Sequence, residues 1–428
     1  MSQGTRYYRL FLNGVGSLLS RSVNVGATAV TIPMTLSALG STDYAIYAII
    51  VSFSLFFSFS DFGIGLSVVN PVAAVQDSNT LEIARSAVTH AWTIQMAVGI
   101  LFALMAASIA GLGKLEFMQW HSASAWAAML VSVGIGMIGA IGPRVMFALG
   151  RNFEGDLWQI AGRVLSVVAT YACVKADAGL SFFVLALMGT PAIVAITMTG
   201  YLFCLSRRDL APNVGEFKRP KAFEQLRTGI QFLILSLSVY FEIGVDSIIL
   251  GAVTEKSVVT QFDIVSKPFV YICSFAGILL FPLWPFLAQE IARGRRIPIS
   301  RLNLAFTALA VLISAVAIPV CIWINQIVFA WVGIQVIFQP NIPALLAFNV
   351  VLVSLGMLQS MVLNSLGMIR EQVRVQLAFL SLLIPAKIGL ATFWGVFGVL
   401  IALTIAYIPR LVYLHVLISR TETRGAPS

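Results

Sequence analysis

Six charged side chains lie inside long apolar stretches of the sequence: Arg21, Glu242, Asp246, Asp263, Lys267 and Lys387. If these stretches cross a membrane, a charge near the centre costs about 2.5–3.5 kcal/mol even on the insertion scale with the lowest penalties. Arg21, Glu242 and Lys387 are the most central, so we treat them as candidates for a functional site. Other charges lie nearer the ends, where long side chains can extend to the interface; they are Arg144, Arg163 and Arg410.

Two of the carboxylates, Glu242 and Asp246, are four residues apart and would share one face of a helix. Like charges at this spacing repel each other, so one of the two is a candidate for holding a proton. Pairing with Arg21 or Lys267 is the competing, structural explanation, and the sequence leaves both open. Asp263 and Lys267 have the same spacing but opposite charges, so they could neutralise each other.

The composition of the 428-residue chain indicates what the apolar stretches are. Apolar residues make up 59% and charged residues 11%, whereas a soluble domain has about 45–50% and about 25%. A soluble globule of this size would lack the polar residues to cover its surface, and a disordered chain would be far less apolar. Because a membrane-spanning helix needs about 20 residues, the apolar content suffices for roughly a dozen spans. The predicted fold class is all-α, a polytopic membrane protein.

Twelve apolar segments predict twelve transmembrane helices, with approximate ranges 11–39, 44–65, 87–111, 123–148, 156–175, 180–205, 229–252, 260–284, 302–324, 340–368, 375–394 and 397–417. Turn and charge signals separate them, such as Gly40-Ser41-Thr42-Asp43. The last two segments are joined by only a few residues around Gly395. Small residues in the fourth segment predict close approach between helices; they are Gly134, Gly136, Gly139 and Gly142.

Basic residues alternate between the two sides of the membrane that this count defines. Eighteen lie in separators on the side of the N-terminus, and three lie on the opposite side, Lys114, Lys175 and Lys256. Because cytoplasmic loops carry an excess of Lys and Arg, both termini are predicted to be cytoplasmic. The formal net charge of +9 therefore reflects orientation, and binding to nucleic acid is not expected.

The longest polar stretch, 206–228, contains six basic residues and divides the twelve segments into two groups of six. We predict an N-terminal six-helix lobe over 1–205, a basic cytoplasmic linker over 206–228 and a C-terminal six-helix lobe over 229–428. Polar side chains follow one face of the first two segments of each lobe, which is typical of helices that line a shared aqueous cavity. In the first segment these include Asn13, Ser17, Arg21, Asn24 and Thr28.

Several classes of function lack support in the sequence. The nucleotide-binding pattern GxxxxGK[ST] does not occur. The four cysteines and three histidines are scattered, without the spacing of a metal site. A membrane polysaccharide polymerase would be expected to have a large outer loop with charged catalytic residues, but the longest predicted outer loop, 325–339, is uncharged. We therefore expect no enzyme, catalytic residue, metal or cofactor, and rank a membrane glycosyltransferase or polymerase third among the functions.

Several short motifs resemble those of a known family. Leu39-Gly40-Ser41-Thr42-Asp43-Tyr44 is similar to the start of the second helix in polysaccharide transporters, although Ala45 stands where they usually have Gly. Asp61-Phe62-Gly63-Ile64-Gly65, followed by Asn70, is similar to their DLGLG…N pattern, and two later signatures are similar to Asn364-Ser365-Leu366-Gly367 and residues 397–402. The sequence resembles the bacterial polysaccharide transporter or O-antigen flippase family, within the multidrug and toxin extrusion-like superfamily.

The resemblance implies two six-helix lobes around a central cavity, lined mainly by spans one, two, seven and eight. It also implies an alternating-access flippase for an undecaprenyl-diphosphate-linked oligosaccharide, moved from the cytoplasmic to the outer leaflet. A diphosphate in a low-dielectric cavity needs cations, and Arg is well suited to forked phosphate contacts. The expected substrate-binding residues are Arg21, Asn24, Lys267 and Lys387. The expected ion- or proton-coupling residues are Glu242, Asp246 and Asp263, and the motif or gating residues are Asp61, Gly63 and Asn70.

This interpretation places the protein in the bacterial inner membrane as a monomeric secondary transporter for O-antigen, lipopolysaccharide or exopolysaccharide biosynthesis. Its expected partners are the lipid-linked oligosaccharide and membrane lipids, with a polysaccharide polymerase complex as a further candidate. The second-ranked function is a cation-coupled exporter of small molecules or drugs in the same superfamily. Cavity charge would discriminate between the two functions, but the three basic and three acidic candidates balance.

Overall fold

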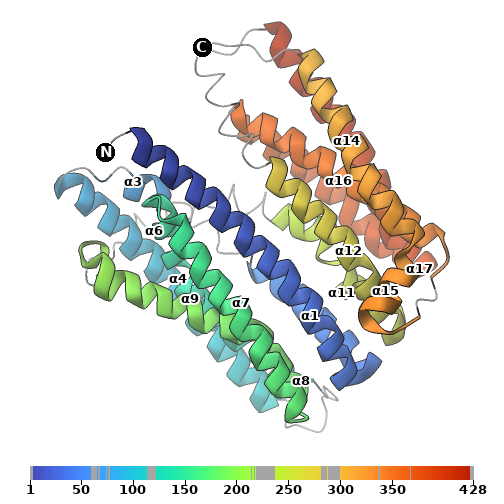
Figure 1. The fold of residues 1–428 in the computed structure, drawn as a ribbon, viewed down its shortest axis with the longest axis horizontal. Helices are drawn as coiled ribbons and strands as arrows, with labels where there is room; N and C mark the ends of the chain where they lie inside the picture. Colours follow the sequence, from blue (N-terminus) through green and yellow to red (C-terminus); the bar gives the residue numbers. More distant parts are fainter. Residues whose placement is uncertain are drawn as a thin grey trace. The chain divides into compact units, whose positions relative to one another are not determined.

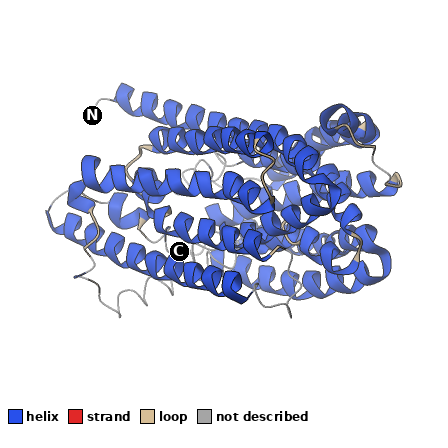
Figure 2. Cartoon of the chain, turned by 90° about the horizontal axis from the view of Figure 1, so that it is seen from below, coloured by secondary structure: helices blue, strands red, loops and turns tan. Residues whose placement is uncertain are grey.

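The computed structural model describes residues 3–58, 65, 68–73, 75, 78–112, 122–213, 215, 217, 237–280, 287, 299–335, 338–366 and 368–424. Every regular element within these residues is a helix (Figure 2). Eight helices in this part of the chain are long and apolar enough to cross a membrane. The predicted all-α, multi-pass class is therefore confirmed.

The chain forms two compact units, Met1–Tyr240 (unit 1) and Phe241–Ser428 (unit 2). The division lies inside the predicted seventh span, downstream of the predicted linker 206–228. Of that linker, the structure describes residues 206–213, 215 and 217.

Unit 1 begins with the long helix α1 (Gln3–Ser58), in which Gly40 has φ +70° and ψ 173°. A positive φ is readily adopted only by glycine, so Gly40 divides α1 where the first and second spans were predicted to separate. In Figure 1, α1 lies beside α7, and the two helices are packed along their length. The other elements of unit 1 are α3 (Val69–Ala73), α4 (Ser78–Leu112), α5 (Ala123–Gly139), α6 (Ile141–Ala148), α7 (Asn152–Lys175), α8 (Leu180–Val184), the π-helical turn η1 (Leu185–Gly189), α9 (Thr190–Tyr201), the π-helical turn η2 (Leu202–Ser206) and the 3-10 turn η3 (Arg208–Leu210).

Glycines bring the helices of unit 1 into close contact. A Cβ atom at Gly99 of α4 would lie 2.7 Å from the carbonyl oxygen of Gly134 in α5, so neither position has room for a side chain. Gly139 lies equally close to α9, and its carbonyl accepts a hydrogen bond of 2.8 Å from the Thr199 hydroxyl. Gly136 differs, because a Cβ there would make only ordinary contact at 3.7 Å. The predicted close approach is thus confirmed for Gly134, Gly139 and Gly142, the last of which lies against Thr199 of α9.

Unit 2 is built around α16, which packs against α12, α14 and α17. A helical segment over 237–243 crosses the boundary between the units and precedes α11. Gly395, with φ +52° and ψ −126°, divides α17 at the predicted junction of the last two spans. The labelled helices of unit 2 (Figure 1) are α11 (Asp246–Val253), α12 (Lys256–Leu280), α14 (Ile299–Ile322), α15 (Ile324–Val332), α16 (Asn341–Ser365) and α17 (Ile369–Arg424).

Helix α15 occupies most of the region that we predicted as the outer loop 325–339. Its sequence is short but strongly apolar, which favours packing as a helix over solvation as a loop. Gly333 ends the helix in the left-handed conformation (φ +78°), and its N–H donates to the Phe329 carbonyl at 2.9 Å. The loop prediction is therefore wrong over 325–332.

The seventh span was predicted as one continuous helix over 229–252, and its described part is interrupted. The helical segment ends at residue 243, Gly244 and Val245 are not helical, and α11 begins at Asp246. Gly244 favours such a break because glycine weakens a helix interior. The interruption lies between two of the candidate carboxylates.

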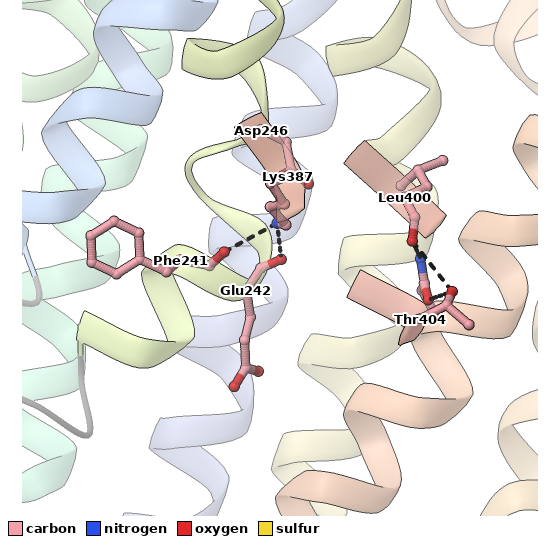
Figure 3. Close-up of polar contacts among 7 residues, drawn as sticks. Phe241, Glu242, Asp246, Lys387, Leu400 and Thr404 are labelled. Carbon is pink, nitrogen blue, oxygen red and sulfur yellow. Dashed lines mark hydrogen bonds and ion pairs between the residues drawn. The ribbon is translucent and has the colours of Figure 1, made fainter. Parts of the chain in front are cut away.

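Polar contacts also join α16 to the second half of α17 (Figure 3). The Thr404 hydroxyl donates to Asn349 Oδ1 at 2.7 Å, and the Asn349 amide donates to the Leu400 carbonyl at 2.9 Å. Asn349 and Thr404 are both buried. Because buried polar groups are stable only when hydrogen-bonded, this arrangement fixes the register between the two helices.

Candidate functional site

Lys387 is the centre of a buried polar cluster in unit 2. It lies in the first half of α17, and its side chain is 0% exposed. Its ammonium donates to Asp246 Oδ1 at 2.5 Å and to the backbone carbonyls of Glu242 at 2.7 Å and Phe241 at 3.1 Å (Figure 3). An ammonium has three donors, so these contacts use all of them. In this conformation Lys387 has no donor left for a substrate phosphate, the role predicted for it.

The helix break changes the relationship predicted between Glu242 and Asp246. The two carboxylates do not repel each other along one face of a continuous helix. Asp246 is the first residue of α11 and pairs with Lys387, whereas the Glu242 carboxylate points away from Lys387 (Figure 3). Of the two explanations that the sequence left open, pairing with a cation is the one observed, with Lys387 for Asp246 and Arg410 for Glu242.

The Glu242 carboxylate contacts three side chains of α17. Gln376 Nε2 and the Tyr407 hydroxyl each lie 3.2 Å from it, and Arg410 Nη1 lies at 3.7 Å. The Arg410 guanidinium also lies over the rings of Phe379 and Tyr407, 5.0 Å and 4.7 Å from their centroids. We predicted that Arg410 would extend to the water interface, but it is only 7% exposed. That prediction is wrong, because aromatic rings and Glu242 enclose the guanidinium.

The partners of Glu242 were not among the residues predicted from the sequence. Arg410 could have been identified as a candidate from the sequence, since it is a charged residue inside a predicted span. No local sequence pattern links Gln376 and Tyr407 to Glu242, because they lie 134 and 165 residues from it in the sequence. Only the packing of α17 brings them to this carboxylate.

Asp263 and Lys267 form the predicted ion pair within α12. Lys267 Nζ lies 2.7 Å from Asp263 Oδ1, and the two side chains are 25% and 8% exposed, respectively. The mutual neutralisation considered from their spacing is therefore present. Their roles in substrate binding and ion coupling stay predictions.

Arg21 and Asn24 lie on α1 in unit 1, and both are exposed. One turn before Arg21, the Ser17 hydroxyl donates to Asp156 Oδ2 of α7 at 3.0 Å. Asp156 also interacts electrostatically with Arg21. Close packing at Gly16, where a Cβ would lie 2.9 Å from the Phe153 ring, brings the two helices together. We did not predict a role for Asp156, because it stood at the very start of predicted span five.

The predicted motif residues cannot be placed in a site. Asp61 and Gly63 lie outside the described residues, and Asn70 lies in α3, where its side chain is not described. Their gating role stays a prediction. Among the described residues, no group of three or more His, Cys, Asp or Glu could hold a metal ion.

Outside the candidate spans, the start of the predicted linker is held against unit 1. Arg207 Nη2 donates to Asp209 Oδ2 at 2.6 Å. Hydrogen bonding to Arg207 and its positive charge hold the pKa of the Asp209 carboxyl below its usual value. The backbone N–H of Asn213 donates to the Thr89 hydroxyl of α4 at 3.0 Å.

A family model described as "Polysaccharide biosynthesis protein" matches residues 11–290. The chain belongs to this family. The resemblance inferred from the short motifs is thereby confirmed, and the match covers most of unit 1 and the start of unit 2. No curated protein matches the sequence.

Solved structures with a similar fold include transporters of the MATE family. An inward-facing multidrug resistance MATE family transporter of the MOP superfamily superposes with a TM-score of 0.72 at 14% identity, covering 95% of this chain and 99% of that one. An outward-facing transporter of the same description gives 0.62 at 12% identity, with 97% and 95% covered. A MATE protein in complex with MaD3S gives 0.66 at 14% identity, with 97% and 96% covered. These likenesses show a MATE-type fold, and with the family they indicate a multi-pass membrane transporter.

Proposed function

We propose that this member of the polysaccharide biosynthesis family is an alternating-access flippase. Its substrate would be an undecaprenyl-diphosphate-linked oligosaccharide, the repeat unit of an O-antigen or exopolysaccharide, moved from the cytoplasmic to the outer leaflet of the inner membrane. Two findings support this proposal together: the family belongs to polysaccharide biosynthesis, and the fold is that of transporters. The distribution of basic residues supports cytoplasmic termini.

The observation that carries the choice of substrate is the exposed Arg21 in a candidate membrane span, Val15–Ser54. An arginine placed here must serve a purpose that outweighs its insertion cost. A guanidinium binds phosphate oxygens in a forked geometry that ammonium groups cannot reproduce. Asn24, exposed on the next turn of α1, adds an amide that can hydrogen-bond a sugar.

We further propose that transport is coupled to an ion gradient, because the sequence lacks the GxxxxGK[ST] motif of a nucleotide-driven pump. Of the three candidate coupling carboxylates, Glu242 is held least tightly. Its contacts of 3.2 Å, 3.2 Å and 3.7 Å compare with 2.5 Å for Asp246 and 2.7 Å for Asp263. A group that must gain and lose a proton is better served by the looser environment.

The test is leaflet movement of a fluorescent undecaprenyl-diphosphate-linked oligosaccharide in proteoliposomes under an imposed pH gradient. Wild-type protein should move the probe, and Arg21→Ala should slow it roughly tenfold to a hundredfold, as expected for lost charge-assisted contacts. Arg208→Ala is the matched control, because Arg208 is an exposed arginine outside the candidate spans. Equal rates for Arg21→Ala and wild type would contradict the assignment of Arg21.

The second candidate function is export of small cationic molecules, which the similarity to multidrug MATE structures favours. Efflux of a cationic dye from proteoliposomes distinguishes the two functions. Dye efflux by the wild type without movement of the lipid-linked probe would replace the flippase proposal with this one.

A further inference from the structure

The break in the seventh span creates an energetic problem in unit 2. In a continuous helix, the carbonyls of Phe241 and Glu242 would accept hydrogen bonds from the N–H groups of residues 245 and 246. Because the helical segment ends at residue 243, those intrahelical bonds are lost. In a membrane, each unsatisfied backbone group is costly, so a break persists only where other groups supply the bonds.

Lys387 supplies them from a different helix. Its ammonium reaches the carbonyls of Glu242 at 2.7 Å and Phe241 at 3.1 Å. The same ammonium contacts Asp246, which begins the helix beyond the break, at 2.5 Å. A cation at the carboxyl end of one helix and an anion at the amino end of the next both complement the helix dipoles. One side chain thus joins both ends of the break.

The Glu242 side chain leaves this junction in another direction and meets a looser set of groups. Arg410 Nη1 is too distant, at 3.7 Å, for a hydrogen bond, and Arg410 Nε and Nη1 have no hydrogen-bond partner in the described part of the chain. Gln376 and Tyr407 face the carboxylate from α17 as well. From α12, the Cys273 thiol is a further titratable neighbour of this carboxylate. The backbone of Glu242 is therefore fixed, while its carboxylate is only weakly restrained.

We infer that Lys387 is a positioning residue: by binding the Glu242 carbonyl and the Asp246 carboxylate across the helix break, it holds the Glu242 carboxylate opposite Arg410. Asp246 is then the counter-ion of Lys387, and of these two carboxylates Glu242 is the one available for ion coupling. The inference rests on the proposed ion-coupled transport and assigns a different role to each of the two carboxylates of the seventh span. Lys387 acts through Glu242 and does not contact substrate.

A mutant cycle on transport separates this role from a merely structural one. Lys387→Met and Glu242→Gln are each expected to slow movement of the fluorescent lipid-linked probe by about tenfold. Because Lys387 acts through Glu242, the double variant should be no more than about twofold slower than Glu242→Gln. Multiplication of the two effects, to about a hundredfold, would overturn the inference.

Two measurements without substrate test the same claim on purified protein. Amide hydrogen exchange over residues 237–253 should accelerate in Lys387→Met and stay unchanged in Glu242→Gln. Covalent labelling of Glu242 by a hydrophobic carbodiimide should be faster in Lys387→Met, because the carboxylate leaves its buried partners. Lys267→Met, which breaks an ion pair within α12, is the control and should change neither quantity. Exchange and labelling at wild-type rates in Lys387→Met would overturn the inference.

If Lys387→Met does not accumulate, Asp246→Asn replaces it in all three experiments. This variant removes the anionic partner of Lys387 and keeps the shape of the side chain. Transport, hydrogen exchange and labelling should therefore change in the same directions as in Lys387→Met, but by smaller amounts. If wild-type protein fails to move the probe, the proposed function is contradicted. The exchange and labelling measurements then still decide whether Lys387 positions Glu242.

Discussion

Arg410 Nη1 lies 3.7 Å from Glu242 Oε1, and both side chains are almost completely enclosed within unit 2. The guanidinium is also stacked over two aromatic rings, which stabilise a cation without accepting its protons. Arg410 therefore compensates the charge of Glu242 without a short hydrogen bond to it. A carboxylate held by contacts of this length can be displaced at lower cost than one held by short hydrogen bonds.

Arg410→Met should destabilise unit 2 by about 3–5 kcal/mol, because it leaves the Glu242 carboxylate buried without its cation. The unfolding free energy in detergent, from denaturant titration, measures this loss. The double variant Arg410→Met/Glu242→Gln is the matched control and should recover part of the stability, since it removes the uncompensated charge. A loss below about 1 kcal/mol in the single variant would place the pair in the range of solvent-exposed ion pairs and contradict the enclosed arrangement.

Gly356→Ala should disturb the same carboxylate from the side of α16. A Cβ at Gly356 would lie 2.5 Å from the Tyr407 hydroxyl oxygen and 2.9 Å from Arg410 Nη1, so both groups must move. The expected cost is about 1–3 kcal/mol for overpacking, again measured by denaturant titration.

Gly389→Ala in α17 is the control for this substitution, because nothing lies within 4 Å of the added Cβ. It should leave stability unchanged or raise it by about 0.5–1 kcal/mol, as for other helical glycines. Equal stabilities for the two alanine variants would show that the space around Gly356 can relax freely.

The positions of the helices followed from the sequence wherever a local signal marked them. Gly40 and Gly395 interrupt α1 and α17 where turn residues and the length of a membrane span required a separation. The all-helical class followed from apolar content alone. Hydropathy responds to the length and polarity of a segment, so it located spans well.

The polar cluster of unit 2 did not follow from the sequence. Hydropathy did not reveal the break at Gly244, because the segment is apolar on both sides apart from Glu242 and Asp246. The pairing of Lys387 with Asp246 joins residues 141 positions apart, and no local pattern encodes such a contact. Spacing alone suggested repulsion between Glu242 and Asp246, which a continuous helix would have produced. Charges inside spans marked Glu242, Asp246 and Lys387 as candidates, and tertiary packing decided which of them meet.

Acid should loosen the start of the predicted linker through Asp209. Arg207 holds the pKa of this carboxyl below its usual value, so the pair contributes stability above that value and loses it as the pH falls through the lowered pKa. The contribution is small because the two side chains are 27% and 39% exposed. The protection of backbone amides 207–213 from hydrogen exchange, corrected for the intrinsic pH dependence of exchange, should fall between about pH 5 and about pH 3 in the wild type. In Asp209→Asn this protection should be low at every pH, and a wild-type pH profile in that variant would contradict the role of the pair.

Asp156→Asn should change how Arg21 binds the diphosphate probe. In the wild type, the Asp156 carboxylate attracts Arg21 and competes with phosphate for its positive charge. Removing that charge should lower the apparent KM for the fluorescent lipid-linked oligosaccharide by about twofold to fivefold, the range of a partly exposed ion pair. The maximal rate should fall, because a probe held more tightly is released more slowly.

Ser17→Ala is the control that separates charge from hydrogen bonding at Asp156. It removes the 3.0 Å hydrogen bond to the carboxylate and leaves the carboxylate charge in place. Its KM should therefore stay near the wild-type value. Transport kinetics of the three proteins in proteoliposomes decide the matter: an unchanged KM in Asp156→Asn would mean that Asp156 serves only to pack α1 against α7. If KM falls in Ser17→Ala as far as in Asp156→Asn, movement of the helices causes the change in KM. Electrostatic competition between Asp156 and the substrate would then be contradicted.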